Sequence, residues 1–427
     1  SNLLGCEAGR TIYDGGNIVA QGNQILTSGK RLSFQALQLE YTTVYFKAKH
    51  FNPTACASYV FDIEQFGKQL SQAYNHAEVP VPTEDPHAET LKALALGLWD
   101  WQRKTYQKGY VVSLSGGADS ALVAASVYLA HQLARMALGE QVYHQQLQQC
   151  GIDIHQDIFS QVLTTVYQAS AHSSERTCLA ARQLAQGLGA KHHQWDIEPQ
   201  VAYSQSLIEK SLERSLTWDK DDIALQNIQA RVRSPGIWMM ANIEGKLLLA
   251  TSNLSEASVG YCTMDGDTSG VLAPIGGISK SLVLKLNHYL CAHGLVLENG
   301  VHLTIPAMAD IISQQPTAEL RPIEQTDEAD LMPFAIMDEI RRLSQVDRLM
   351  GNTLVDALSH SSAGQGYDKS ILYQYVNKYF RLYSKNQWKR ERLAVSFHIE
   401  EDSACAKTYR RYPILNHLSN VNDIGLS

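Results

Sequence analysis

The sequence predicts an α/β protein in which helices cover both faces of a parallel sheet, with a short β-rich segment before it. Short apolar strands alternate with helical stretches over most of the chain, and this alternation is typical of a parallel sheet covered on both sides. Residues 1 to about 50 alternate short apolar runs with turn signals instead, which predicts a few antiparallel strands. A proline-containing segment, Glu78 to His87, separates the two parts and predicts a linker.

The amino-terminal strands are expected where turn residues precede β-branched or aromatic runs. Asp14-Gly15-Gly16 precedes Ile18 to Ala20, Gly22-Asn23 precedes Ile25-Leu26, and Thr42 to Phe46 forms a further run. So few short strands make a poor independent domain, so this segment must pack on another part of the protein.

The elements after the linker follow in a regular order. Apolar residues at helical spacing, from Leu91 to Trp101, predict an amphipathic helix. Strands are expected at Tyr110 to Leu114, Val162 to Tyr167, around His193 to Ile197, and at Lys246 to Thr251, and a helix at Ala121 to Leu133. The polar stretch Gly139 to Gln156 is either an insertion loop or a surface helix.

Composition excludes several classes of protein. The chain of 427 residues has a formal net charge of -7, which argues against a general affinity for nucleic acid. Its 7 cysteines are scattered and odd in number, as expected for reduced thiols in a cytoplasmic protein. No run approaches the roughly 18 consecutive apolar residues of a membrane span, and the first ten residues lack the pattern of a signal peptide.

The segment Ser115-Gly116-Gly117-Ala118-Asp119-Ser120 lies between a predicted strand and a predicted helix. The amides of such a turn and helix start favour an anion. The glycines let a phosphate approach the backbone, the two serines add hydroxyl donors, and Asp119 can hold a divalent cation. The segment lacks the G-K-[ST] ending of a Walker loop. The alternative is an ordinary glycine turn with a helix cap.

This loop resembles the pyrophosphate loop of the ATP pyrophosphatase superfamily, also called the adenine nucleotide alpha hydrolase type, whose members have a Rossmann-like sheet and cleave ATP between the α and β phosphates. Further segments narrow the resemblance; they are Asn227 to Arg233, Leu247 to Glu256, Gly266-Asp267, Ala273 to Lys280, and Pro316 to Pro322 followed by Gln325 to Glu328. Together they resemble the glutamine-dependent NAD⁺ synthetases, from about Glu89 to the basic segment near the carboxyl terminus.

The resemblance implies a domain organisation and an activity. Residues 88–427 correspond to the synthetase domain, residues 78–87 to a linker, and residues 1–77 to the carboxyl-terminal part of a nitrilase-like α/β sandwich that hydrolyses glutamine. The implied reaction is a carbon–nitrogen ligation: deamido-NAD⁺, ATP and ammonia give NAD⁺, AMP and pyrophosphate, with Mg²⁺ as cofactor. A homodimer or larger homo-oligomer is expected by the same resemblance, with no membrane and no nucleic acid as partner.

Site residues are carried over position by position. The resemblance assigns ATP binding to Ser115, Gly116, Gly117, Asp119, Ser120, Gln168, Thr251, Lys280 and Thr317. It assigns the dinucleotide substrate to Arg231, Arg233, Asp267 and Lys389, the magnesium ion to Asp119 and Glu256, and catalysis to Asp119, Asp267 and Lys280.

Plainer roles compete with these assignments. Arg231 and Arg233 are two residues apart and cannot share a helical face, so one of them can be a surface charge. Glu256 can be an ordinary acid at a helix start, Thr317 can cap a turn, and Lys280 or Lys389 can be solvated.

Three positions depart from the family pattern. Pro235 disfavours helix at the residue before it and can re-aim Arg233, Asp265 stands where an aromatic residue is common, and Trp388 replaces a histidine.

Cys6 precedes Glu7 in a glycine-flanked turn, but it matches a non-catalytic position and has no visible base beside it. In the family a Glu, Lys and Cys set hydrolyses glutamine, and all three precede the matched region, so the chain as given is expected to use free ammonia. Three alternatives from other classes are another ATP pyrophosphatase, such as a GMP synthetase or a tRNA-thiolating enzyme, a nitrilase-class amidohydrolase, and a non-catalytic nucleotide-binding subunit.

Overall fold

The computed structural model describes residues 5–7, 9–21, 24–36, 84–297, 300–314, 320–321, 327–409 and 414. Three expectations lie outside these residues: the strand at Thr42 to Phe46, residues 78–83 of the linker, and the side chain of Thr317.

The described residues form a six-stranded sheet in which every neighbouring pair of strands is parallel. The strand order is β10-β7-β6-β3-β4-β5. The strands are β3 (Tyr110–Ser113), β4 (Leu163–Ala169), β5 (Lys191–Asp196), β6 (Leu247–Leu249), β7 (Leu272–Ala273) and β10 (Val395–Ser396). This sheet confirms the predicted fold class.

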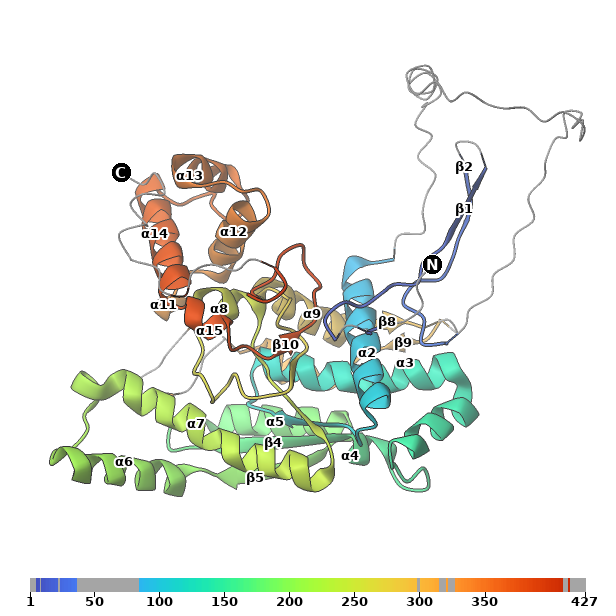
Figure 1. The fold of residues 1–427 in the computed structure, drawn as a ribbon, viewed down its shortest axis with the longest axis horizontal. Coiled ribbons are helices and arrows are strands. Elements are labelled where there is room, and N and C mark those ends of the chain that lie inside the picture. The colour runs from blue at the N-terminus through green and yellow to red at the C-terminus, as the bar shows by residue number, and fades with distance from the viewer. Residues whose placement is uncertain are drawn as a thin grey trace, which may run out of the picture.

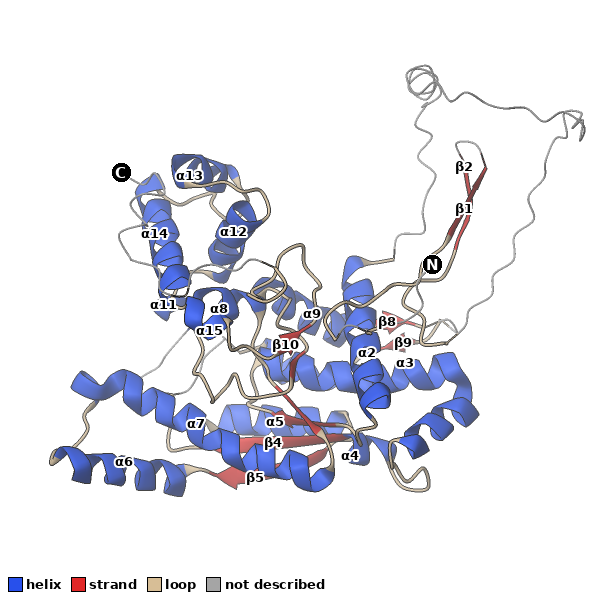
Figure 2. Cartoon of the chain, viewed as in Figure 1, coloured by secondary structure: helices blue, strands red, loops and turns tan. Residues whose placement is uncertain are grey.

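Alternate residues of the central strand β3 belong to different apolar clusters, and Figure 2 shows helices, in blue, around the strands, in red. Tyr110 and Val112 belong to the main core, beneath α3 (Ala118–Gln149). Val111 instead packs with residues of α7 (Trp218–Glu244), including Ile237. Since successive side chains of a strand point to opposite faces, a strand buried on both sides has to be apolar throughout.

The chain leaves β3 toward β4 and β5 and then returns to the other side of β3 for β6, β7 and β10. At this reversal the loops after β3 and β6 diverge, and they leave a crevice at the carboxyl ends of the two strands. The loop Ser115 to Ser120 follows β3, and the segment Thr251 to Asn253 follows β6. The fold therefore brings two of the predicted motifs to one edge of the sheet.

Helices surround this sheet along its length (Figure 1). Those within the sheet-forming part are α2 (Pro86–Thr105), α4 (Ile158–Val162), α5 (Glu175–Gly187), α6 (Glu198–Leu212), α8 (Leu254–Val259), α9 (Lys280–Ala292), η1 (Pro306–Met308), α10 (Ala309–Ile312) and α11 (Asp327–Asp330). A short antiparallel pair, β8 (Leu295–Val296) and β9 (His302–Leu303), follows α9.

A second apolar cluster lies toward the carboxyl terminus (Figure 1). It is formed mainly by α12 (Phe334–Gln345), α13 (Gly351–His360) and α14 (Lys369–Lys385), and α15 (Gln387–Arg390) follows it. Val259 at the end of α8 belongs to the same cluster. Because α8 starts beside the crevice and ends in this bundle, the bundle supports one wall of the crevice.

The amino-terminal segment contains an antiparallel hairpin, as predicted, with strands β1 (Ile18–Gln21) and β2 (Gln24–Ser28). Its start is held on α2 by Asp100, whose carboxylate is 1% exposed and accepts a hydrogen bond from the Cys6 amide at 2.8 Å. Trp101 Nε1 donates to the carbonyl of Gly9 at 3.1 Å, and the amide of His398 donates to the carbonyl of Arg10 at 3.0 Å. The segment thus packs on the main body, as its small size requires.

The structure corrects several details. β7 and β10 were not predicted, because two-residue strands carry too little periodicity to be seen in a sequence. The stretch from Gly139 to Gln149 is helical and continues α3 beyond a positive φ of 75° at Gly139, so the surface-helix alternative holds for that part. α7 continues through Pro235, and α2 begins at Pro86, so the end of the expected linker is helical.

Among the described residues, α3 alone is long and apolar enough to cross a membrane by length and composition. Its most apolar window is 67% buried inside the protein. Such burial is expected of a core helix that packs on a sheet, which is what α3 does here.

We expect Asp100→Asn to lower the free energy of unfolding by about 1–3 kcal/mol, the usual cost of leaving a buried polar partner unsatisfied. Asp100 pairs with Arg103 at 2.7 Å and Lys104 at 3.1 Å in addition to the Cys6 amide. Urea unfolding measures the change. The control is Asp356→Asn, which removes an exposed pair with Lys369 and should change stability little. Equal losses in both variants would contradict this account.

Candidate functional site

A cavity of about 930 Å³ opens at the carboxyl ends of β3, β4 and β6. Most of the predicted site residues line it. They are Ser115, Gly117, Asp119, Ser120, Gln168, Arg231, Arg233, Thr251, Glu256, Asp267 and Lys389. The structure therefore brings together segments that lie more than two hundred residues apart in the sequence.

The loop after β3 is held in shape by its own serines. The Ser120 side chain is 2% exposed, and its Oγ accepts from the Ser115 amide at 3.2 Å and lies 3.1 Å from Ser115 Oγ. The amide of Gly117 donates to Ser115 Oγ at 3.3 Å. Gly117 is the N-cap of α3 and supplies no side chain to the first helical amides. These amides and the helix dipole therefore favour an anion at this end of the cavity.

Gly116 permits this loop to pack tightly on α5. Its φ is +83°, and a Cβ built at this position would lie 2.2 Å from the carbonyl oxygen of Thr177. Any side chain would therefore push the loop away from α5 and move the amides that face the cavity. The loop geometry requires glycine at this position for both reasons.

Lys280 lies between two carboxylates beside this loop. Its side chain is 3% exposed, and its Nζ contacts Asp119 Oδ2 and lies 3.1 Å from Glu256 Oε1. Asn253, the N-cap of α8, donates from Nδ2 to the other oxygen of Asp119 at 3.0 Å. Its own Oδ1 accepts from the Glu256 amide at 3.0 Å. One fully buried asparagine thus holds both acids in place.

Negative charge exceeds positive charge in this cluster. Burial disfavours the charged form of Lys280, but Asp119 and Glu256 outweigh it and raise the pKa of the ammonium. Burial raises the pKa of Glu256 against the pull of Lys280, and Asp119 and Asp327 raise it further. The pKa of Asp327 is raised as well, first by burial and then by Asp119 against the pull of Lys280. Three acids thus share one ammonium.

The donor set fits a hard divalent cation. Asp327 Oδ1 is buried and has no hydrogen-bond partner in the part of the chain that the structure describes. Carboxylate oxygens are what Mg²⁺ takes from proteins when it also binds phosphates. The described residues do not, however, gather three or more His, Cys, Asp or Glu ligands at metal-binding distance. The carboxylates of Asp119 and Glu256 therefore suit a cation that would arrive with a phosphate.

The two arginines of α7 lie on different sides of the helix, as predicted. Arg231 is exposed to the cavity and donates from Nε to the carbonyl of Met264 at 3.1 Å. Arg233 donates to the carbonyls of Gln168 at 3.3 Å and Gln229 at 3.0 Å. The Arg233 side chain therefore lies against the backbone of β4, although α7 continues without a break through Pro235.

Gln168 borders the cavity, but both ends of its amide are engaged. Its Oε1 accepts from Ser113 Oγ at 2.7 Å, and its Nε2 donates to the carbonyl of Arg233 at 2.8 Å. In this arrangement Gln168 joins β3, β4 and α7. A nucleotide base would meet the surface that Gln168 holds in place more readily than the amide itself.

Asp267 and Lys389 line the same cavity, and the charge of Lys389 acts on the Asp267 carboxylate. Asp267 is in contact with the solvent of the cavity but is otherwise surrounded by protein, and this desolvation raises its pKa to about 6 although Lys389 and Arg233 oppose the shift. Its Oδ1 accepts from the Thr263 amide at 2.6 Å. Lys389 donates to the carbonyls of Gly260 and Cys262, each at 2.7 Å.

Some functional residues were not singled out from the sequence. Asn253 lies in the segment T-S-N-L-S-E. An asparagine directly before a helix is a recognisable N-cap pattern in a sequence. Arg321 pairs with Asp222 at 2.7 Å and with Asp330 at 3.2 Å at the cavity wall. Its partners come from distant segments, so the sequence alone gives no sign of the pairing.

Cys6 behaves as the sequence predicts. It is 4% exposed, and burial, reinforced by Asp100, raises the pKa of its thiol to about 11. A thiol that stays protonated is a poor nucleophile.

The chain is similar to known proteins over most of its length. The sequence pattern of the NAD synthase family matches residues 90–394. The glutamine-dependent NAD(+) synthetase of Bos taurus is 28% identical over 97% of this chain and 63% of its own length, and that of Homo sapiens is 27% identical over 98% and 64%. The crystal structure of a glutamine-dependent NAD(+) synthetase from Cytophaga hutchinsonii matches with a TM-score of 0.75 and 31% identity, over 97% of this chain and 62% of that one. The chain thus spans less than two thirds of these relatives.

We expect Gly116→Ala to weaken binding of ATP with Mg²⁺ by tenfold or more, because the added Cβ displaces the loop. Gly139→Ala is the matched control: its φ is also positive, at +75°, but a Cβ there meets nothing within 4 Å. Both substitutions place a side chain at a positive φ and carry backbone strain of about 1–3 kcal/mol, but Gly116→Ala alone adds a clash with the carbonyl of Thr177. Isothermal titration calorimetry measures the affinity. Equal affinities in the two variants would show that the loop does not hold the nucleotide.

Proposed function

Because this chain belongs to the NAD synthase family, we propose that it catalyses the ATP-dependent amidation of deamido-NAD⁺ to NAD⁺, with release of AMP and pyrophosphate. The chain spans 63% of the length of the bovine relative it matches, so the activity, its substrates and its partners are proposals for this chain. The nitrogen donor is ammonia, which comes from glutamine where a complete amidase domain is present.

One observation carries this proposal. A single cavity is lined both by residues of the loop Ser115 to Ser120 with its neighbour Glu256, and by Arg231, Asp267 and Lys389. These two groups of side chains suit two different substrates, one bearing a triphosphate and one bearing a carboxylate. Thr251 and Ser252, which follow β6, line the same cavity.

In the first step an oxygen of the nicotinate carboxylate attacks the α phosphorus of ATP, and the bond from that phosphorus to the bridging β-phosphate oxygen breaks. This gives a mixed anhydride with AMP and releases pyrophosphate. The loop amides and Lys280 stabilise the charge that develops on the phosphate oxygens, which is the largest contribution a protein makes to phosphoryl transfer. Bound Mg²⁺, held by Asp119 and Glu256, would neutralise charge on the same oxygens.

In the second step ammonia attacks the activated carbonyl carbon, and AMP leaves with the anhydride oxygen. The nitrogen must lose a proton to become a neutral amide. Asp267 lines the cavity together with Lys389 and Arg233, whose charges act on its carboxylate, and as a carboxylate it can accept that proton.

A narrow second cavity suggests a route for ammonia. It is lined mostly by small side chains, such as Ala250, Ala273 and Gly276, and it reaches Arg10 of the amino-terminal segment. Ser252 borders both cavities, and its buried Oγ has no hydrogen-bond partner among the described residues. This arrangement favours delivery from the side on which the amino-terminal segment packs.

We infer a cytoplasmic homodimer or larger homo-oligomer that binds neither nucleic acid nor membranes, in keeping with the net charge of -7. Residues 1–77, 78–87 and 88–427 are proposed as amidase remnant, linker and synthetase domain. Thr251 and Thr317 are proposed ATP contacts.

The first test compares NAD⁺ formation from deamido-NAD⁺ and ATP with ammonia or with glutamine as donor. We expect this chain to form NAD⁺ with ammonia and to release one pyrophosphate for each amide. Asp119→Ala should lower kcat by about 10²-fold or more, the usual loss when a charge-stabilising group is removed, while the exposed Asp356→Asn keeps wild-type activity. A non-catalytic nucleotide-binding subunit would bind ATP without releasing pyrophosphate.

The second test uses pH. Asp267 has a pKa raised to about 6, so it loses the ability to accept a proton as the pH falls through that value. At a constant concentration of unprotonated ammonia, kcat/KM should fall about tenfold per pH unit below pH 6. Asp267→Asn should have lower activity and a profile that lacks this acidic limb. Retention of the limb in Asp267→Asn would assign the proton acceptor to another group.

A further inference from the structure

The position of Lys280 depends on the first amides of α9. These amides have no partners inside a helix, yet here each is satisfied by a side chain. The amide of Ser279 donates to Glu400 Oε1 at 2.6 Å, that of Lys280 to Ser255 Oγ at 2.8 Å, and that of Ser281 to Asp338 Oδ2 at 3.2 Å. Two of these acceptors, Glu400 and Asp338, come from segments far along the chain.

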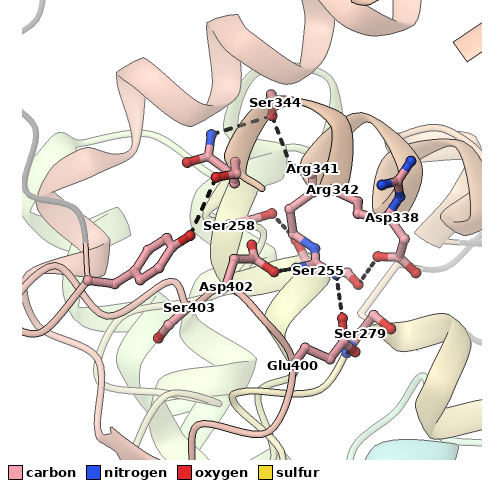
Figure 3. A network of polar contacts seen from close by, with 12 residues as sticks. Ser255, Ser258, Ser279, Asp338, Arg341, Arg342, Ser344, Glu400, Asp402 and Ser403 are labelled. Atoms are coloured by element: carbon pink, nitrogen blue, oxygen red, sulfur yellow. Dashed lines mark hydrogen bonds and ion pairs between the residues drawn. The ribbon is translucent and has the colours of Figure 1, made fainter. Parts of the chain in front are cut away.

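Asp338 of α12 joins two of these contacts (Figure 3). Its Oδ2 accepts from the amide of Ser281, and its Oδ1 accepts from the hydroxyl of Ser255. Ser255 in turn accepts from the Lys280 amide. A single carboxylate therefore ties the start of α9 to the start of α8.

The two serines that Asp338 binds are sequence neighbours of residues in the acidic cluster. Ser255 directly precedes Glu256, and Ser281 directly follows Lys280. Glu256 Oε1 and Lys280 Nζ are 3.1 Å apart. Because Asp338 fixes the neighbours of both residues, it fixes the backbone separation from which their side chains meet.

The helix that carries Asp338 is itself anchored. Arg341, one turn further along α12, has a side chain that is 4% exposed and pairs with Glu400 at 2.6 Å and with Asp402. These acids follow β10, and Figure 3 shows them on the opposite side of Arg341 from Ser344. The first residue of α12, Phe334, places its ring centroid 5.4 Å from Lys280 Nζ. α12 therefore contacts both the backbone and the ammonium of Lys280.

We propose that Asp338 is a positioning residue for the adenylylation step: through Ser255 and Ser281 it holds Lys280 at the distance from Glu256 and Asp119 that the phosphates of ATP require. The inference rests on the proposed function and adds a residue outside the cavity lining to it. A role confined to capping α9 would affect stability alone, because a carboxylate near a helix start stabilises the helix without directing any one side chain.

The experiment compares Asp338→Asn, Asp338→Ala and Ser255→Ala with the control Asp100→Asn. Asn keeps one acceptor oxygen and loses the other, whereas Ala loses both. Asp100 is an equally hydrogen-bonded acid on α2 that does not contact the acidic cluster. Folded fraction is checked by urea unfolding, and kinetics are measured with saturating ammonia well below the melting temperature.

We expect kcat to fall about tenfold in Asp338→Asn and up to about 10²-fold in Asp338→Ala, since small misplacements of a reacting group cost this much. KM for deamido-NAD⁺ should stay unchanged, because Asp338 is not among the residues that line the cavity with Arg231 and Lys389. The double variant Asp338→Asn/Ser255→Ala should lose no more kcat than the more impaired single variant, because both substitutions break the same link between Asp338 and Ser255. Asp100→Asn should lose stability and keep kcat.

Wild-type kcat in a folded Asp338→Asn, or an equal loss in Asp100→Asn, would overturn the proposal. If Asp338→Ala does not fold, Asp338→Asn and Ser255→Ala decide the question. Calorimetry with ATP and Mg²⁺ separates this inference from the proposed reaction. Should the wild type form no NAD⁺, a several-fold weaker ATP affinity in Asp338→Asn than in Asp100→Asn would still support positioning of Lys280, and equal affinities would refute it.

Discussion

The contact of Lys280 with Asp119 and Glu256 is the interaction on which the site depends. It joins the starts of three helices, α3, α8 and α9, which follow three different strands of the sheet. A buried ammonium is tolerated only when its charge is paired, so the position of each helix start constrains the other two. Burial raises the pKa of Glu256, and Asp119 and Asp327 raise it further; this surplus of acid over base makes the cluster receptive to a further cation.

The parallel sheet explains why these helix starts meet. Every strand of the sheet ends at the same edge, and the reversal of strand order at β3 leaves a crevice there. The carboxyl-terminal bundle also supports the site, from outside the sheet. α12 packs against α8 and α9, and its Asp338 and Phe334 support Lys280 from outside the crevice. The two apolar clusters of the protein therefore serve one site.

Much of this arrangement could be predicted from the sequence. The loop Ser115 to Ser120 follows an apolar strand and opens a helix, and local pattern is enough to place it. Residues whose role depends on partners from distant segments could not be found in this way. In the sequence Asp338 is one acid of an amphipathic helix, and its role becomes visible only when α9 packs beside it. The hydrogen bonds of the Gln168 amide likewise depend on α7 crossing β4. Pro235 disfavours helix at the residue before it, yet α7 continues through Pro235, because the tertiary contacts of α7 outweigh the local preference.

The division of charge along the cavity bears on which substrate binds at which end. A bare triphosphate would be repelled by Asp119, Glu256 and Asp327, and only its neutralisation by a divalent cation turns the acidic end into a phosphate site. In the proposed reaction the carboxylate substrate carries no such cation, so the positive charges of Arg231, Arg233 and Lys389 on the same cavity would attract it. The carboxylate that is activated and the phosphate that activates it would therefore be sorted by this electrostatic difference.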